Sequence, residues 1–341
     1  MGYRTNATQV IQARPDLSGQ VAVVTGGSSG IGVETVRALA SAGVDCVLCC
    51  RNVEAGQRVA AELQPEAVGK ITVQCLDLGD LSSVHAAATQ LAAQLPRLDM
   101  LVLNAGVMAP RAVDGKPQRT ADGFELQFGT NHLSHFYLCK LLLPKMKASG
   151  SAGRVVVVSS SAYAFGRIDL DDPNYNSRSY RPWDGYNQSK LANRLFVHEL
   201  ARRLKEEGSA VEAFSVHPGG RLRRSKHGCW ARRLFPPPAS CSCRLSTSVG
   251  IIKTSIGDHI GFRASCFYAL AGPFLKSPSQ GAATTVFGAV SKELDDKSGA
   301  HLQDCAVVRV AQRGRDDAVA TTLWSKSEEL VSAALQRRGI E

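Results

Sequence analysis

Long hydrophobic runs are missing from this sequence of 341 residues. No stretch approaches the roughly 18 apolar residues that a membrane-spanning helix needs, and Leu141–Leu143 is bounded by Lys140 and Lys145. The opening residues Met1–Asn6 lack the apolar core of a secretory signal. Because 44% of the chain is hydrophobic and 6% aromatic, its composition excludes a disordered chain or a small disulfide scaffold. We expect a soluble, cytoplasmic protein, with organelle targeting left open.

Acidic residues are missing from residues 220–250, a segment that differs in character from the rest of the chain. It contains Pro236–Pro238 and three of the ten cysteines. Its basic residues are Arg221, Arg223, Arg224, Lys226, Arg232, Arg233 and Arg244. Without these seven charges the formal net charge of +10 falls to +3, so the positive charge belongs mainly to one segment.

Ten cysteines would allow a disulfide network, but their positions favour buried thiols. Cys46, Cys49, Cys50 and Cys75 lie in strand-like apolar runs and Cys139 in a helical one, which is typical of free thiols in a reducing compartment. The spacing of Cys46 and Cys49 suits a redox or zinc pair, but residues three apart on a strand point to opposite faces. We therefore expect no metal site.

Short apolar runs alternate with longer helical stretches from Val21 onward. The runs are apolar at successive positions, which is typical of strands buried on both faces of a parallel sheet with helices on either side. The predicted strands are Val21–Thr25, Asp45–Cys50, Ile71–Cys75, Met100–Asn104, Arg154–Ser159, Ala210–Val216 and Gly299–Asp304. The predicted helices are Ile31–Ala42, Leu81–Leu95, Phe124–Met146, Tyr186–Lys205, Pro278–Ala289 and Ala318–Leu335. Right-handed crossovers then give an α/β fold with one doubly wound parallel sheet (Rossmann fold), a single domain over residues 19–341 after an N-terminal extension at 1–18.

A glycine-rich turn follows the first predicted strand and leads directly into a helix. Glycines there allow a tight turn and let the backbone approach a pyrophosphate at the helix N-terminus. The predicted cofactor-binding residues of this turn are Thr25, Gly26, Ser28, Ser29, Gly30, Ile31 and Gly32. The second strand ends without the carboxylate that would bind the ribose of NAD, whereas Arg51 offers a cation for a 2′-phosphate. The sequence therefore favours NADP(H) over NAD(H).

Tyr186 and Lys190 are four residues apart and share one face of a predicted helix. Free tyrosine titrates near ~10, so acid–base work near neutrality requires a pKa roughly 3 units lower. A neighbouring ammonium and an oxidised nicotinamide both stabilise the phenolate and lower this pKa. The pattern indicates a proton-transfer pair beside a nicotinamide cofactor.

Seven motifs follow one another in an order that resembles the short-chain dehydrogenase/reductase family. They are Thr25–Gly32, Asp77–Leu78, Asn104–Gly106, Asn131, Ser159–Ser161, Tyr186–Lys190 and His217–Gly219. Asn131–Phe136 and Lys276–Thr284 are similar to its retinol dehydrogenase branch and to the oxidoreductase domain of the WW-domain-containing oxidoreductase. One departure is Ser134, where that branch usually has glycine.

His132 and His135 have helical spacing but no third ligand of matching spacing, so we expect helix packing there and not metal binding.

The resemblance implies a role for each matched residue. Tyr186 would be the general acid/base, and Ser160, chosen by alignment over its serine neighbours, would hold the substrate oxygen. Lys190 would bind the nicotinamide ribose and lower the pKa of Tyr186, while Asn131 would position a water for proton relay. Further cofactor contacts would come from Asp77, Leu78, Asn104, Ala105, Gly106, Pro218, Gly219 and Thr254, together with Tyr186 and Lys190.

Residues 220–250 interrupt the family pattern. Without them, His217–Gly219 would continue directly into Ile251–Thr254, which is the run expected in the family after the sixth strand. We interpret the segment as translated non-coding sequence, an in-frame unspliced intron, and expect it to be disordered. The alternatives are a flexible basic loop and a patch for nucleic acid or anionic lipid. Since most of the net positive charge belongs to this segment, which we interpret as non-coding sequence, we expect no nucleic-acid partner.

The expected activity is reversible hydride transfer between NADP(H) and a lipophilic carbonyl or alcohol that is retinoid-, steroid- or aldehyde-like. The apolar segment Gly261–Leu275 lies over the substrate in this family, which implies a lipophilic ligand and leaves membrane-surface contact open. The alternatives are a non-catalytic NADP-binding interaction protein and an isoform inactivated by the insertion at 220–250. Helices around Phe124–Met146 and Tyr186–Lys205 form dimer faces in many relatives, so a homodimer is compatible with the sequence.

Overall fold

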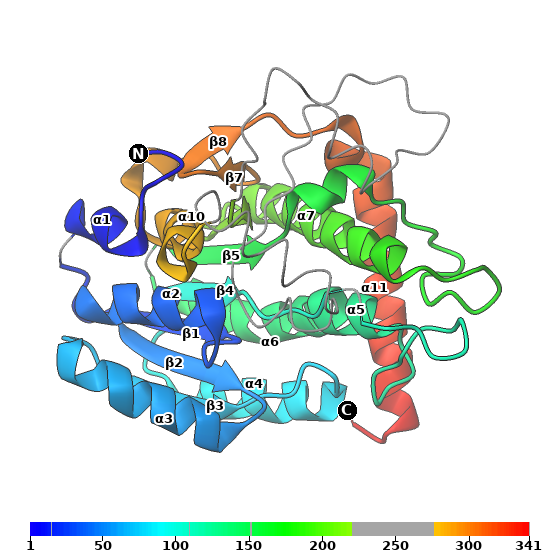
Figure 1. The fold of residues 1–341 in the computed structure, drawn as a ribbon, viewed down its shortest axis with the longest axis horizontal. Helices are drawn as coiled ribbons and strands as arrows, with labels where there is room; N and C mark the ends of the chain where they lie inside the picture. Colours follow the sequence, from blue (N-terminus) through cyan, green and yellow to red (C-terminus); the bar gives the residue numbers. More distant parts are fainter. Residues whose placement is uncertain (15, 109, 151, 220–275, 341) are drawn as a thin grey trace, which may run out of the picture.

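A twisted sheet lies at the centre of the molecule. The computed structural model describes residues 1–14, 16–108, 110–150, 152–219 and 276–340. In these residues eight strands lie in the order β3-β2-β1-β4-β5-β6-β7-β8, and every neighbouring pair is parallel except the antiparallel β7–β8. The strands are β1 Val21–Thr25, β2 Asp45–Cys50, β3 Ile71–Cys75, β4 Met100–Leu103, β5 Arg154–Val158, β6 Glu212–His217, β7 His301–Gln303 and β8 Ala306–Val308. The predicted doubly wound sheet is confirmed (Figure 1).

Helices cover both faces of the sheet, which is why β1, β4 and β5 are buried along their whole length (Figure 1). One hydrophobic core joins the sheet to α4 Leu81–Gln94, α6 Ser134–Ala148, α7 Pro182–Glu206 and α11 Asp317–Arg337. The other core joins it to α1 Ala7–Gln12, α2 Gly30–Ser41, α3 Val53–Leu63 and α10 Pro278–Val290. Short 3₁₀ turns lie at Gln64–Glu66, Ser161–Phe165, Lys292–Leu294 and Gln312–Arg315.

The predicted helical stretch Phe124–Met146 is helical from Leu126 onward, but it is not a uniform α-helix. The segment forms a short α5 at Leu126–Phe128, a π-helical turn at Gly129–Leu133, and then α6. A π-turn adds one residue to a helical turn, which a hydrophobic period of 3.6 cannot reveal. Such turns are frequent at functional sites, and this one contains Asn131.

Other differences concern element ends and short elements. α1, α3 and β8 were not among the elements predicted from the sequence. α7 begins at Pro182, four residues earlier than predicted, because proline suits the first position of a helix. Tyr186 therefore lies one turn inside α7 and not at its start.

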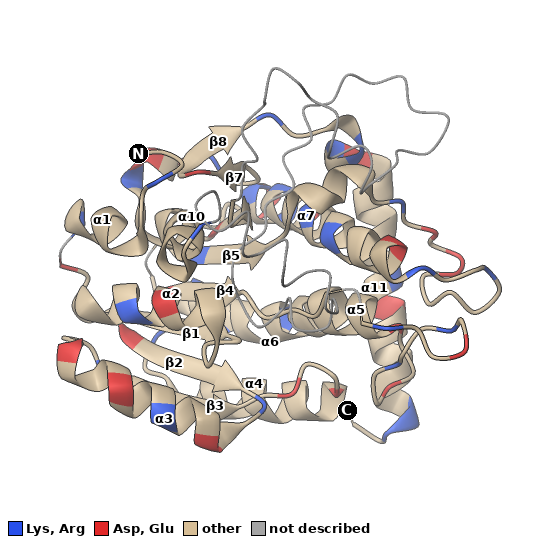
Figure 2. Cartoon of the chain, viewed as in Figure 1, with Lys and Arg blue, Asp and Glu red and all other residues tan. Residues whose placement is uncertain are grey.

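Several predictions fall outside the described residues: the disordered insertion at 220–250, the apolar segment Gly261–Leu275, and Thr254. Among the helices that the structure does describe, none is both long and apolar enough to cross a membrane. Acidic and basic positions both occur along α3, on the outside of the molecule (Figure 2).

Candidate active site

Most of the predicted site residues lie at the carboxyl ends of the parallel strands. Thr25, Arg51, Asp77, Asn104, Ser160 and Pro218 end or closely follow β1, β2, β3, β4, β5 and β6 in turn. Because these six strands are parallel, their carboxyl ends lie on the same side of the sheet. Open α/β sheets bind their ligands in the crevice outside these ends.

In the glycine-rich turn, Gly26 and Gly32 are packed so closely that no side chain larger than hydrogen fits at these two positions. A Cβ atom on Gly32 would lie 2.1 Å from the carbonyl oxygen of Gly26, and one on Gly26 would lie 2.9 Å from the Cα atom of Ala105. Gly26 also has a φ of +69°, a conformation that favours glycine. Glycine at these two positions is therefore required by the close packing of the turn against its own backbone and Ala105.

Thr25 joins the glycine-rich turn to the end of β4. Its Oγ1 atom accepts hydrogen bonds from the backbone N–H groups of Asn104 at 2.9 Å and Ala105 at 3.1 Å. In return, the Asn104 side-chain amide donates to the Thr25 carbonyl oxygen at 3.0 Å. The two motifs, 79 residues apart in sequence, are thus joined at the carboxyl ends of β1 and β4.

The end of β2 meets the glycine-rich turn through the Gly26 N–H, which donates to the Cys49 carbonyl oxygen at 2.8 Å. Burial raises the pKa of the Cys50 thiol, and its hydrogen bond with Ser28 acts in the opposite direction. Arg51 follows as an exposed side chain and forms no ion pair with any residue in the described part of the chain. A cation thus stands at the strand end where NAD-binding proteins place a carboxylate.

Ser160 and Tyr186 are hydrogen-bonded to each other, although 26 residues separate them in sequence. Burial raises the pKa of Tyr186 to about 12, and the hydrogen bond to Ser160 acts against that rise. The neighbouring Ser159 is committed elsewhere, since its hydroxyl donates to the Lys190 carbonyl oxygen at 2.7 Å. The structure thus places Ser160, and not Ser159, against the phenol.

Lys190 lies one turn after Tyr186 on α7 and is buried. Its Nζ atom donates to the Val158 carbonyl oxygen at 3.0 Å and lies 5.7 Å from the centre of the Tyr186 ring. Burial lowers the pKa of Lys190 to about 8. Since this value is above 7, the side chain is still mainly an ammonium at neutral pH. The expected lowering of the Tyr186 pKa by Lys190 is not found in the described structure, where burial raises that pKa.

Asn131 is fully buried in the π-turn and holds the backbone that follows β4. Its amide donates to the Val107 carbonyl oxygen at 2.9 Å and to Ser189 Oγ at 3.0 Å, and its Oδ1 accepts from the Val107 N–H at 2.8 Å. A Cβ on Gly106 would lie 3.0 Å from Asn131 Oδ1 and 3.6 Å from Lys190 Nζ. Asn131 and Lys190 therefore meet at Gly106. Ser189 was not predicted from the sequence, where its signal is its place one helical turn after Tyr186.

Ser134, the departure from the family pattern, fits the fold without a gap. Its buried hydroxyl donates to the Leu78 carbonyl oxygen at 2.7 Å and so ties the start of α6 to the predicted adenine-binding segment. Asp77, one residue earlier, accepts from the Gly79 N–H at 2.8 Å. The extra hydroxyl is thus satisfied by a backbone acceptor.

His132 and His135 point to different elements. The His132 ring packs against Phe128, Phe136 and Phe196, and its Nε2 atom lies 2.9 Å from Ser327 Oγ on α11. His135 instead reaches β1. The expected helix packing accounts for His132, and the two rings do not converge on one point.

An ion pair between the buried Lys276 and the partly exposed Asp304 lies at the end of β6. Lys276 Nζ donates to Asp304 Oδ1 at 2.7 Å and lies 3.5 Å from the Pro218 carbonyl oxygen. A Cβ on Gly219 would lie 2.2 Å from that Nζ. The sequence analysis used Lys276 only as part of a family match and missed this pairing, since 28 residues separate the two partners.

Replacing Lys276 with methionine is expected to lower the free energy of unfolding by about 3 kcal/mol, because Asp304 then keeps a poorly solvated charge without its partner. Urea denaturation measures the loss. The double variant Lys276→Met/Asp304→Asn, which removes both charges, should regain part of the stability. A single variant as stable as the wild type would contradict this account.

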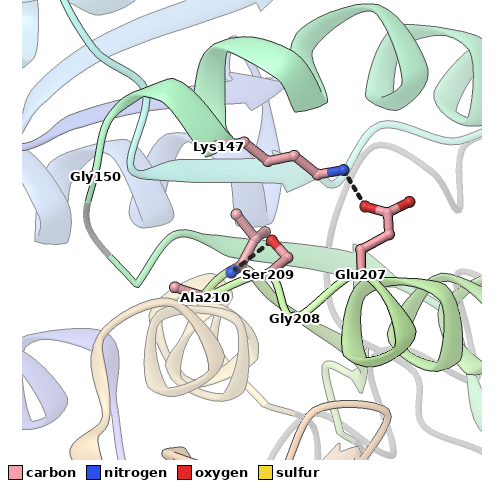
Figure 3. Close-up of a pocket in the computed structure, with 7 residues that line it drawn as sticks. Lys147, Gly150, Glu207, Gly208, Ser209 and Ala210 are labelled. Carbon is pink, nitrogen blue, oxygen red and sulfur yellow. Dashed lines mark hydrogen bonds and ion pairs between the residues drawn. The ribbon is translucent and has the colours of Figure 1, made fainter.

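A surface hollow of about 300 Å³ lies at the other end of the sheet, before β5 and β6 begin (Figure 3). Its lining includes the ion pair Lys147–Glu207 and the turn at Gly208–Val211. None of the predicted site residues lines this hollow, so its position gives no support for a catalytic role.

Residues 20–223 match the family model described as short chain dehydrogenase. With this match and the relatives below, the chain belongs to the short-chain dehydrogenase/reductase family of oxidoreductases. Within it, the chain is similar to retinol dehydrogenases: human retinol dehydrogenase 11 is 38% identical over 92% of this chain and 86% of that protein, and human retinol dehydrogenase 13 is 34% identical over 94% and 86%. A crystal structure of an uncharacterised protein from Mycobacterium paratuberculosis has a TM-score of 0.70 and 32% identity, covering 97% of this chain and 98% of that one.

Proposed function

We propose that this protein transfers a hydride reversibly between NADP(H) and a lipophilic carbonyl or alcohol, retinoid-, steroid- or aldehyde-like. The observation that carries the proposal is the grouping of Ser160, Tyr186 and Lys190 beside a glycine-rich dinucleotide turn. A hydrogen-bonded phenol next to a buried ammonium is suited to give a proton to a carbonyl oxygen or to take one from an alcohol.

The crevice fits a nicotinamide dinucleotide. Gly26 and Gly32 form a tight turn between β1 and α2, and the N-terminus of α2 is where a pyrophosphate would bind. Asp77 and Leu78 would contact adenine, Lys190 the nicotinamide ribose, and Thr254 the nicotinamide amide. When bound, the nicotinamide supplies or accepts the hydride.

The protein's own groups would control the proton and the orientation of the substrate. Ser160 would hold the substrate oxygen while Tyr186 protonates it, and the Lys190 ammonium would stabilise the phenolate that remains. Asn131, joined to Ser189 and to the backbone at Val107, would position a water for proton relay. All of these side chains are on rigid elements, so little reorganisation is required when substrate binds.

Two features support a lipophilic substrate. The similar human proteins are named retinol dehydrogenases. Two large aromatic side chains, Phe165 and Trp183, are exposed by 46% and 41% on the elements that follow Ser160 and carry Tyr186. Trp183 lies edge-on to the Tyr186 ring at 5.9 Å, so an apolar surface adjoins the proposed acid/base.

Replacing Arg51 with aspartate is expected to reverse the cofactor preference from NADPH to NADH, because a carboxylate repels the 2′-phosphate and accepts hydrogen bonds from the ribose hydroxyls. Loss of one charge-assisted contact corresponds to about 1.5–3 kcal/mol, or roughly 10- to 100-fold in NADPH affinity. Fluorescence titration with each cofactor measures the change.

The matched control is Arg58→Asp on α3, the helix that begins two residues after Arg51, which makes the same charge change at another exposed position. It should leave the preference unaltered. An Arg51 variant that still prefers NADPH as strongly as the wild type would remove the support for NADP(H).

A further inference from the structure

His135 is a buried histidine that bridges two parts of the proposed active site. It lies in the first turn of α6 with 1% of its surface exposed. Its Nε2 atom is 2.9 Å from Thr25 Oγ1, 110 residues away in sequence, and its Nδ1 atom is 3.1 Å from the carbonyl oxygen of Asn131. The ring therefore connects the base of the glycine-rich turn with the backbone of the π-turn.

These contacts determine where the ring carries its hydrogen. A carbonyl oxygen can only accept, so Nδ1 must donate to Asn131. Burial, together with the nearby charge of Lys190, lowers the pKa of His135 to about 3, so the ring is neutral near pH 7 and Nε2 has no hydrogen. The Thr25 hydroxyl then donates its one hydrogen to Nε2 at 2.9 Å, a shorter contact than the 3.4 Å from the same oxygen to the Val102 carbonyl oxygen. The lone pairs of its oxygen stay available to the N–H groups of Asn104 and Ala105.

The consequence is one directional chain of hydrogen bonds. It runs from the backbone after β4 to Thr25, from Thr25 to His135, and from His135 to the Asn131 carbonyl. The Asn131 side chain returns to the same backbone at Val107, which closes the network around Gly106. Each member fixes the position of the next.

We propose that His135 is a positioning residue for the reaction: in its neutral Nδ1–H form it holds the Asn131 peptide and the Thr25 hydroxyl in register, and so aligns the π-turn with the cofactor crevice. The effect of His135 on the reaction rate rests on the proposed function. The tautomer of His135 and its two hydrogen-bond partners do not depend on any substrate.

The first test measures the tautomer by ¹⁵N NMR on histidine-labelled wild-type protein between pH 6 and 9. The His135 signals, assigned by their loss in a His135→Asn variant, should show a protonated Nδ1 and an unprotonated Nε2 over the whole range. A hydrogen on Nε2, or a titration of the ring in this range, would overturn the proposal.

The second test compares His135→Leu with His135→Asn. Leucine removes both hydrogen bonds, whereas the asparagine amide can still donate toward the Asn131 carbonyl. Displacement of a catalytic group by about 1 Å reduces the rate by roughly 10²-fold, so His135→Leu should lose about that factor in kcat with little change in KM for NADPH. His135→Asn should recover part of kcat.

Circular dichroism measures the folded fraction of each variant, and kcat is calculated per folded molecule. If His135 only stabilised the fold, kcat calculated in this way would equal that of the wild type. Full kcat in His135→Leu would overturn the proposal. If the leucine variant does not fold, the kcat of His135→Asn and the tautomer measured by NMR still test the proposal. If wild-type protein reduced no carbonyl at all, the proposed function would fail while the NMR result could still stand.

Discussion

Replacing Tyr186 with phenylalanine is expected to reduce kcat by about 10³-fold and to leave NADPH affinity intact, since a positioned general acid contributes roughly 10²–10⁴-fold. The substitution removes only the phenol hydroxyl, which is the group hydrogen-bonded to Ser160. Lys190 keeps its hydrogen bond to the Val158 carbonyl, and the glycine-rich turn is untouched. A loss of this size corresponds to about 4 kcal/mol of transition-state stabilisation.

The protonation state of Tyr186 supports this expectation. Because burial raises its pKa to about 12, the phenol carries its proton at neutral pH in the ligand-free protein. That form suits carbonyl reduction, in which Tyr186 must donate. Alcohol oxidation requires the phenolate, which an oxidised, positively charged nicotinamide and the Lys190 ammonium would favour.

The measurement is NADPH consumption with a panel of retinoid, steroid and aliphatic aldehydes, combined with a fluorescence titration of the cofactor. Tyr137→Phe is the matched control, because it removes another largely buried hydroxyl, 2.7 Å from His85 Nδ1 and outside the proposed site. The control should retain full kcat. Unchanged turnover in the Tyr186 variant would instead favour a non-catalytic cofactor-binding protein.

Replacing Gly32 with alanine is expected to weaken NADPH binding by roughly 10- to 100-fold and to lower the melting temperature. The new Cβ would lie 2.1 Å from the Gly26 carbonyl oxygen and 2.9 Å from the Asn104 side-chain amide, so the turn must move. Overpacking of this kind costs about 1–3 kcal/mol. A shifted turn also loses the backbone position that a pyrophosphate requires.

Calorimetric titration with NADPH and a thermal melt measure the two effects. Gly2→Ala is the control, because its Cβ would meet no atom within 4 Å. It should change neither quantity. A Gly32→Ala variant that binds NADPH as tightly as the wild type would contradict the assignment of the turn to the cofactor.

Much of the fold follows from local pattern. The ends of β1, β2 and β3 agree with the predicted strands, because apolar residues at successive positions are read directly as strands buried on both faces. The glycine-rich turn is equally local, since its conformation depends on neighbouring residues. The π-turn at Gly129–Leu133 was not predictable, because it changes the helical period by a single residue.

The candidate site also contains features that local sequence predicts and features that depend on the tertiary structure. The sequence by itself determined the doubly wound sheet, the phosphate-binding turn and the pairing of Tyr186 with Lys190 on one helix face, since all three depend on short-range spacing. Only the tertiary structure decided that Ser160 meets Tyr186 and that His135 joins Thr25 to the π-turn. These partners are 26 and 110 residues apart, and strand order and helix packing, not spacing, determine which polar groups meet.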